Sequence, residues 1–219
     1  MMYKQNDKVG QLKLAIALEL LPNLPPIPIN NYSLIVADPP WAFNLRETDP
    51  THRNRCPYPN MSDEAILTLP IGAIAADHAY LLLWVTNNHL PLGFSCLNYW
   101  GFKYKSIFTW VKTVAASTEE NPKAHIGIGH YGRNCTEHFL VATKGNPGSW
   151  TTLGLTNIPN VIFARRSEHS KKPEEFWAIA NRLAQQLGGE KIELFARESA
   201  SAPLRERRPG WDVWGAEVS

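Results

Sequence analysis

Four consecutive residues, Asp38-Pro39-Pro40-Trp41, bring together a carboxylate, a stiff backbone carbonyl and a flat aromatic ring. Asp38 and the carbonyl of Pro39 could accept the two hydrogens of an exocyclic amine. Trp41 could stack on the ring that bears the amine, an interaction worth roughly 1–3 kcal/mol for a nucleic-acid base. The segment offers no hydrogen bond to the amine's lone pair, which stays free to attack. It therefore suits chemistry on an amino-bearing heterocycle; the alternative is a rigid corner with a core tryptophan.

The residues before this segment predict the element that positions it. Residues 34–37 form a short apolar run, typical of a central parallel strand covered on both faces. Pro39 and Pro40 end the strand, because neither can donate to a sheet ladder and each fixes φ near −65°. We therefore expect Asp38 at the carboxyl end of a strand, where open α/β sheets bind their ligands.

A second cluster of chemically useful residues lies late in the chain, at residues 165–172. It holds four cations, Arg165, Arg166, Lys171 and Lys172. It follows a predicted strand at residues 161–164 and precedes a predicted helix at 174–187 that ends before two glycines. A strand's carboxyl end and a helix's amino end suit an anion such as a carboxylate or a phosphate. The alternative is a solvated charged face.

The remaining pattern predicts alternating strands and helices, as a parallel α/β sheet requires. Further strands are expected at residues 79–85, 106–111, 136–143 and 191–196. Helices are expected at residues 10–21 and 88–100, and a third begins at Ser62 as N-cap, with Asp63 and Glu64 in its first turn. A proline-rich connector, residues 22–31, links the first helix to the first strand.

Two long segments, residues 42–60 and 113–133, are expected to be mobile loops beside the site. The first carries cations that could meet phosphates, with a solvated loop as the alternative; these are Arg46, His52, Arg53 and Arg55. The second spells G-x-G-x-x-G at Gly127, Gly129 and Gly132. We reject a dinucleotide site there, because that motif should follow a strand and open a helix, and here it runs into a predicted strand.

Length and composition predict one globular domain with a full core: 219 residues, 44% hydrophobic and 19% charged. The net charge of +2 gives no overall basicity that would indicate nucleic-acid binding. Any basic surface that contacts nucleic acid must therefore be local. The cysteines Cys56, Cys96 and Cys135 are odd in number and form no C-x-x-C pair, which favours a reducing compartment. No signal pattern and no membrane-length apolar run is present, so we expect a cytoplasmic protein.

These motifs together resemble a known family. The DPPW segment is similar to the Asp/Asn-Pro-Pro-aromatic motif of amino-methyltransferases that use S-adenosylmethionine. More narrowly, the chain resembles the DPPW-type adenine-N6 methyltransferases, typified by the catalytic subunit of the eukaryotic messenger-RNA adenosine methyltransferase. The likeness runs from about Tyr32 to Glu217. Its further matches are Tyr58 before a helix, Glu137 in a Glu-His pair, Ser170 to Glu174, Glu193 to Arg197, and the tail from Gly210.

The resemblance implies an α/β fold of the Rossmann-like methyltransferase type, with a mostly parallel sheet, helices on both faces and a permuted motif order. Residues 1–30 would be an N-terminal helix and connector, and residues 31–219 a single methyltransferase domain. Similar LLLWVT and WVK segments in the family suggest that Trp84 and Trp110 are structural core residues.

The resemblance also implies residue roles. The catalytic residues would be Asp38, Pro39, Pro40 and Trp41. Substrate would be bound by Tyr58, Arg53, Arg55, Glu137, Arg165 and Arg166. Cofactor would be bound by Asp38, Lys172, Ser170, Glu193, Phe195, Arg197 and Glu217, with Lys172 on the methionyl carboxylate and Arg197 near the ribose.

Several alternatives to these roles stay open. Glu137 could be a surface carboxylate at a strand start, Glu193 a structural acid, and Tyr58 a half-buried turn residue. The chain also departs from the family pattern. Ala216 stands where an amide is common, and Ser199-Ala200 where the family has a His/Asn pair. Both departures predict weaker cofactor binding.

The implied function is methyl transfer from S-adenosylmethionine to the 6-amino group of adenine, with S-adenosylhomocysteine as product and no metal. DNA is the favoured substrate, because small one-domain relatives resemble bacterial or phage DNA methyltransferases; RNA is the alternative. The implied assembly is a monomer or homodimer, with a pseudo-methyltransferase as a possible partner, and no membrane association. A competing hypothesis is a non-catalytic, nucleic-acid-binding partner subunit. A small-molecule nucleotide enzyme would need a glycine-rich phosphate loop, which the sequence does not show in the right context.

Overall fold

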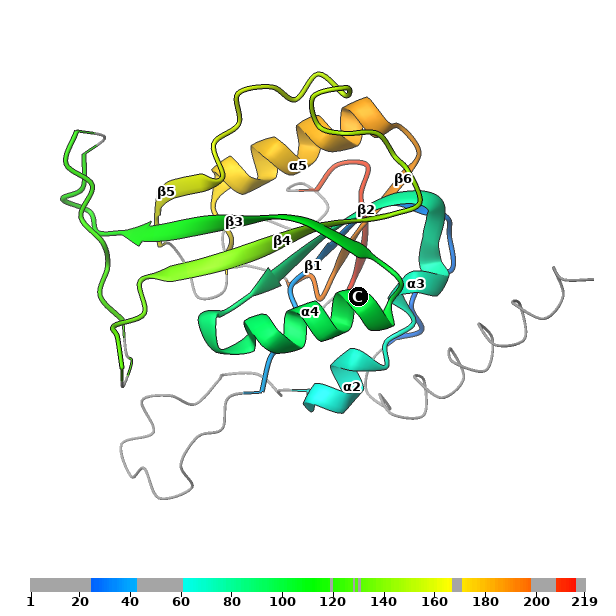
Figure 1. The fold of residues 1–219 in the computed structure, drawn as a ribbon, viewed down its shortest axis with the longest axis horizontal. Coiled ribbons are helices and arrows are strands. Elements are labelled where there is room, and N and C mark those ends of the chain that lie inside the picture. Colours follow the sequence, from blue (N-terminus) through cyan, green and yellow to red (C-terminus); the bar gives the residue numbers. More distant parts are fainter. Residues whose placement is uncertain are drawn as a thin grey trace, which may run out of the picture.

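The computed structural model describes residues 25–42, 61–118, 120–127, 129, 131–166, 171–197 and 208–215 (Figure 1). The helix predicted at residues 10–21 and most of the loop at 42–60 lie outside the described residues. No helix in the described part of the chain is long and apolar enough to cross a membrane.

A seven-stranded sheet forms the centre of the molecule, in the order β5-β3-β4-β2-β1-β6-β7. Its strands are β1 (Tyr32–Ala37), β2 (Ala75–Val85), β3 (Lys103–Thr113), β4 (Thr136–Lys144), β5 (Val161–Arg165), β6 (Glu190–Leu194) and β7 (Asp212–Trp214). Within the described residues, β4 is antiparallel to both of its neighbours, and every other adjacent pair is parallel. The mostly parallel sheet predicted from the sequence is confirmed.

Helices cover both faces of this sheet, as predicted. Helix α5 (Glu174–Leu187) lies along one face, and α4 (Leu90–Tyr99) lies on the other with the short α2 (Asp63–Leu67) and α3 (Ile71–Ile74) (Figure 1). A 3₁₀ turn, η1 (Asn87–His89), leads from β2 into α4. The fold is therefore a three-layer α/β sandwich with Rossmann-like layering.

The side chains of β1 alternate between two apolar cores. Leu34 and Val36 belong to the core that contains Phe176 of α5. Ile35 and Ala37 belong to the other, which α2, α3 and α4 cover. Both faces of the strand are buried, which explains why its sequence is continuously apolar rather than alternating.

Local signals set several element boundaries. The Ser62 hydroxyl caps α2 by accepting a hydrogen bond from the N–H of Ala65 at 3.1 Å, as predicted. Helix α5 ends at Gly188, whose φ of 63° is a conformation that favours glycine. The predicted strand at 191–196 was wrong at its end: β6 stops at Leu194, because Phe195 turns the chain with a φ of 62°.

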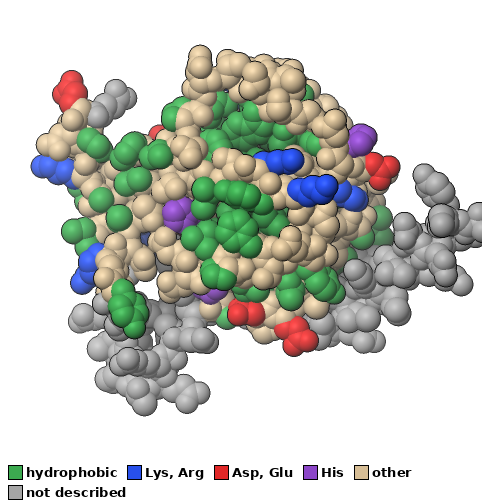
Figure 2. Space-filling model, in the orientation of Figure 1, with side chains coloured by type: hydrophobic (Ala, Val, Ile, Leu, Met, Phe, Trp, Pro, Cys, Tyr) green, Lys and Arg blue, Asp and Glu red, His purple; other side chains and the backbone are tan. Residues whose placement is uncertain are grey.

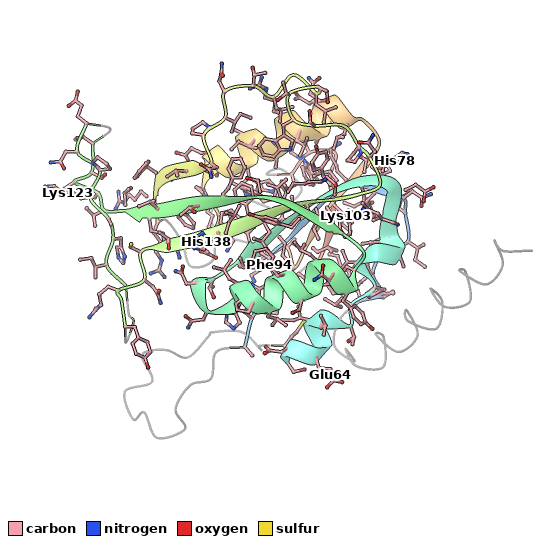
Figure 3. All side chains as sticks on the ribbon, viewed as in Figure 1. Glu64, His78, Phe94, Lys103, Lys123 and His138 are labelled. Atoms are coloured by element: carbon pink, nitrogen blue, oxygen red, sulfur yellow. The ribbon has the colours of Figure 1, made fainter. Side chains whose placement is uncertain are left out.

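The segment between β3 and β4, residues 114–135, projects from the body of the molecule and is called the arm here (Figure 1). Lys103 marks the start of β3 and Lys123 lies on the arm beyond its end (Figure 3). The N–H of Val114 donates to the carbonyl of Lys123 at 3.0 Å, and that of Gly127 to Asn134 at 2.8 Å. The described residues of the arm contain no helix, and the arm runs into β4, which agrees with rejecting a dinucleotide motif. Its mobility stays a prediction.

One face of the molecule carries an exposed aromatic pair. Phe94 of α4 and Tyr104 of β3 meet edge to face with ring centroids 5.2 Å apart. Figure 2 shows hydrophobic side chains gathered in the middle of this face, over α4 and β3. The pair lies towards the start of β3, away from the edge of the sheet at which Asp38 follows β1.

Candidate active site

The candidate site lies at the edge of the sheet where the parallel strands have their carboxyl ends. Asp38 directly follows β1, and Lys112 is the next-to-last residue of β3. Because β4 runs the opposite way, its amino end reaches the same edge and places Glu137, its second residue, there. The central strand β1 has β2 on one side and the late strand β6 on the other. Ligands of open α/β sheets bind at such a reversal of strand order.

Four charged residues at this edge form a continuous ion-pair chain: Lys112, Glu137, Lys172 and Asp38. The Nζ atom of Lys172 lies 3.0 Å from Oδ2 of Asp38 and 2.6 Å from Oε1 of Glu137. The other oxygen of Glu137, Oε2, lies 2.9 Å from Nζ of Lys112. Opposite charges therefore alternate along the edge from β3 to β1.

The residues of the ion-pair chain differ in how deeply they are buried. The side chain of Lys172 is 8% exposed and that of Glu137 is 11% exposed, whereas Asp38 keeps 23%. The ammonium of Lys172 also lies 4.9 Å from the ring centroid of Trp84, in β2, between the strands that carry the two acids. Asp38 is thus the carboxylate of the pair more open to a ligand.

The electrostatics separate the two carboxylates. Burial raises the pKa of Asp38 above its usual value, and the nearby Lys172 only partly opposes this. Burial acts in the same direction on Glu137, but Lys172 and Lys112 together outweigh it and lower its pKa to about 2. Burial disfavours the charged form of Lys172, yet Asp38 and Glu137 outweigh that cost and raise its pKa. Asp38 is therefore the stronger base of the two carboxylates, and it is also the one more exposed to solvent.

The Pro-Pro corner has a defined geometry. The Pro39 carbonyl accepts the N–H of Trp41 at 2.8 Å, and the Pro40 carbonyl accepts that of Met61 at 3.1 Å. A carbonyl oxygen has two lone pairs, so Pro39 keeps one acceptor position for an amine hydrogen. Both hydrogen bonds hold the chain directly after Asp38, the predicted catalytic acid.

Trp41 lies in the core rather than in an open groove. It is 4% exposed, and its indole N–H donates to the carbonyl of Trp84 at 3.0 Å. Its ring stacks on His89 at 5.5 Å between centroids, and His89 Nε2 lies 2.8 Å from the carbonyl oxygen of Ala42. This placement matches the alternative of a core tryptophan at a rigid corner. Stacking of Trp41 on a substrate base stays a prediction.

The predicted cofactor residues of β6 lie next to β1. Glu193 pairs with Val36 in register and receives a hydrogen bond from Nε of Arg208 at 2.9 Å. Phe195 packs against Trp214 with ring centroids 5.2 Å apart. Arg197 lies close enough to Asp38 to lower its pKa electrostatically. Arg197 follows β6 and Asp38 follows the neighbouring strand β1, so both residues lie at the same edge of the sheet.

The other predicted site residues lie elsewhere. Arg165 and Arg166 are exposed at the end of β5, which β3, β4 and β2 separate from β1. Their predicted contact with a nucleic-acid backbone would be made at the far end of the same edge. The remaining predicted residues lie outside the described part of the chain, and their roles stay predictions; these are Arg53, Arg55, Tyr58, Ser170 and Glu217.

The residues at this edge belong to a part of the sequence that matches a known protein family. The sequence model of the MT-A70 family matches residues 32–217, which include every charged residue of the ion-pair chain. The chain belongs to the MT-A70 family. The predicted resemblance to DPPW-type methyltransferases is confirmed by this match.

The relatives of this chain differ widely in the share of their length that it covers. A putative N(6)-adenosine-methyltransferase of Medicago truncatula is 31% identical over 192 residues, which are 87% of this chain and 27% of the plant protein. The N(6)-adenosine-methyltransferase catalytic subunit METTL3 of Homo sapiens is 33% identical over 191 residues, 87% of this chain and 29% of METTL3. The type II methyltransferase M.MunI of Mycoplasma sp is 29% identical over 233 residues, 98% of this chain and 86% of M.MunI. The chain thus spans about a quarter of the adenosine methyltransferases and most of M.MunI.

Three residues at the candidate site were not predicted from the sequence: Lys112, Trp84 in its contact with Lys172, and Arg208. Lys112 directly follows the strand predicted to end at residue 111, and a cation at a strand's carboxyl end was a usable signal. Trp84 was correctly predicted to be core, but its ring also supports Lys172. No local signal marked Arg208. The alternative that Glu137 is a surface carboxylate is wrong, since it is buried between two lysines.

Proposed function

We propose that this chain transfers a methyl group from S-adenosylmethionine to the 6-amino group of adenine in nucleic acid. The observation that carries the proposal is the partly exposed Asp38 carboxylate at the end of β1, paired with Lys172 at 3.0 Å and followed by the Pro39 carbonyl. Membership of the MT-A70 family, and relatives named as N(6)-adenosine methyltransferases, support it.

The acceptor side of the site suits an aromatic amine. Asp38 and the second lone pair of the Pro39 carbonyl accept the two amine hydrogens and fix the nitrogen's orientation. Asp38 also stabilises the positive charge that develops on the nitrogen as it is alkylated, in a site whose burial strengthens electrostatic effects. The lone pair of the nitrogen is left free to react.

The residues of the cofactor side fit S-adenosylmethionine by their chemistry. Lys172 suits the methionyl carboxylate, and Asp38 suits the ammonium group beside it. Glu193 on β6 suits the ribose hydroxyls. Arg197, which acts electrostatically on Asp38, follows the same strand. The cofactor, when bound, would supply an electrophilic methyl group and become S-adenosylhomocysteine, and the methylated amine would lose one proton. The protein's part is to bind, orient and partly desolvate the amine that accepts this group.

We favour DNA over RNA as the source of the adenine. The chain aligns with 86% of the type II methyltransferase M.MunI, but with only 27% and 29% of the two adenosine methyltransferases. This difference in coverage supports DNA. A target base in a duplex must be extruded, at a cost of a few kcal/mol. We therefore expect faster methylation of single-stranded than of duplex DNA when no partner assists.

A second candidate is a non-catalytic nucleic-acid-binding subunit. The retained acid argues against it, because Asp38 is present, partly exposed and held by Lys172. Such a subunit would bind nucleic acid and yet transfer no methyl group.

The test is transfer of radiolabelled methyl from S-adenosylmethionine to matched single- and double-stranded DNA and RNA. We expect incorporation into adenine that is abolished in Asp38→Ala. The matched control is Asp77→Ala, which removes an exposed acid near the opposite end of β2 and should leave the rate unchanged. Full activity in Asp38→Ala, or no transfer to any nucleic acid by the unaltered protein, would overturn the proposal.

A further inference from the structure

The tail before β7 contributes a buried cation that contacts the predicted cofactor side. Arg208 is 7% exposed, and its Nε donates to Oε2 of Glu193 at 2.9 Å. The guanidinium carbon of Arg208 lies 3.2 Å from the ring centroid of Trp177 in α5. The arginine therefore lies between an acid of β6 and an aromatic ring of the helix that covers the sheet.

Glu193 needs this cation because of the face of β6 to which it belongs. Its neighbours Ile192 and Leu194 point into one apolar core. Glu193 pairs in register with Val36, whose side chain belongs to the other apolar core, below α5. A carboxylate against apolar side chains is costly unless it is paired and hydrogen-bonded. Arg208 supplies that pairing and restricts the rotamer of Glu193.

The segment that carries Arg208 is itself fixed to α5. The indole N–H of Trp211 donates to Oδ1 of Asn181 at 2.9 Å, and the ring of Trp211 meets that of Trp177 at 5.8 Å. The following strand β7 pairs with β6, with Val213 opposite Glu193. Backbone pairing and the Arg208 guanidinium thus hold Glu193, while α5 holds the segment that supplies the guanidinium.

We propose that Arg208 is a positioning residue for the cofactor: it holds the Glu193 carboxylate in the orientation that binds the ribose hydroxyls. This rests on the proposed function. In this proposal the two alternatives for Glu193 are compatible, because Arg208 pairs with the same carboxylate that binds the ribose. A lysine cannot replace Arg208 fully, because only a planar guanidinium both stacks on the indole and donates in its own plane.

The inference predicts a selective loss of cofactor affinity. In Arg208→Gln we expect the dissociation constant for S-adenosylhomocysteine to rise at least about tenfold, as for loss of one partner of a buried charge pair. Arg208→Lys should lie between this variant and the unaltered protein. At saturating cofactor, kcat should stay within about twofold, because Arg208 acts on binding and not on the amine.

The experiment is isothermal titration of the full chain with S-adenosylhomocysteine. It compares Arg208→Gln, Glu193→Gln and the double variant. If Arg208 acts through Glu193, its substitution changes affinity by less than about twofold once Glu193→Gln is present. Arg182→Gln is the matched control, because Arg182 is an exposed arginine of α5 that donates to the carbonyl of Gly154. It should bind normally.

Each outcome decides the matter. Equal affinity of the unaltered protein and Arg208→Gln, or independent additive losses in the double variant, would overturn the role of Arg208 and leave the proposed function standing. Failure of the unaltered protein to bind S-adenosylhomocysteine would overturn the proposed function and this inference together. Thermal melts check folding, and if Arg208→Gln does not fold, Arg208→Lys carries the same comparison.

Discussion

The ammonium of Lys172 lies 3.0 Å from the carboxylate of Asp38, although the two residues are far apart in the matched sequence, residues 32–217. The acid follows β1 and the lysine precedes α5, so their pairing joins the Pro-Pro corner to the late cation cluster. The two predicted halves of the site are consequently one electrostatic unit. A substitution on either side should change the ionisation of the other.

The pH dependence of methyl transfer should respond in opposite directions to two substitutions. The active form needs ionised Asp38, whose pKa Lys172 lowers and Glu137 raises. Lys172→Met should therefore move the acid limb of the kcat/KM profile to higher pH, and Glu137→Gln should move it lower, each by about one pH unit. Initial rates at saturating cofactor, measured across the pH range, give both shifts. Shifts in the same direction would show that Asp38 is not the titrating group, and Lys171→Met serves as the charge-matched control.

Acid should destabilise the protein partly through Glu137. Its pKa in the folded state is about 2, below its ordinary 4.5, because two lysines surround the carboxylate. The unfolded chain binds this proton first, so the stabilisation is complete above about pH 4.5 and is lost as the pH falls towards 2. Melting temperatures over that range should fall less steeply in Glu137→Gln than in the unaltered protein. Parallel curves would contradict the role of the two lysines.

Trp41→Phe tests whether the Trp41 indole stabilises the fold or stacks on the substrate base. The variant keeps an aromatic ring but leaves the carbonyl of Trp84 without its 3.0 Å hydrogen bond. We expect a loss of about 1–3 kcal/mol in the free energy of unfolding, measured in urea. Trp100→Phe is the matched control, since its indole donates to the carbonyl of Leu67 at 2.9 Å, away from the site. A KM for nucleic acid that rises only in Trp41→Phe would support stacking on the base.

Gly215→Ala should disturb the cofactor side through β6 and β7. An added Cβ would collide with the carbonyl oxygen of Ala196, whose N–H donates to the carbonyl of Trp214 at 2.9 Å. We expect a stability loss of about 1–3 kcal/mol and weaker binding of S-adenosylhomocysteine, measured by melting and titration. Gly132→Ala, on the arm, meets nothing within 4 Å and should be neutral. Equal effects of the two substitutions would contradict a specific collision at Gly215.

The parts of the fold that local chemistry decides were predictable from the sequence. The apolar run of β1 and the Ser62 cap of α2 each depend on a few adjacent residues. The reversal of β4 and the three-residue strand β7 depend on pairing with strands far away in the chain, which no local pattern encodes. The same holds for the site. Asp38 and Lys172 carry recognisable motifs, whereas the contact between Lys112 and Glu137 exists only because β3 and β4 pair in one particular register.

The reversed direction of β4 also separates two jobs along one stretch of chain. The β3–β4 register fixes Lys112 and Glu137 at the edge, whatever lies between the strands. The arm leaves and re-enters the sheet at this register, so insertions or deletions within it need not displace either charge. A homologue could therefore lengthen or exchange the arm while the electrostatics around Asp38 stay as they are. The antiparallel strand thus separates the length of this connection from the geometry of the charges.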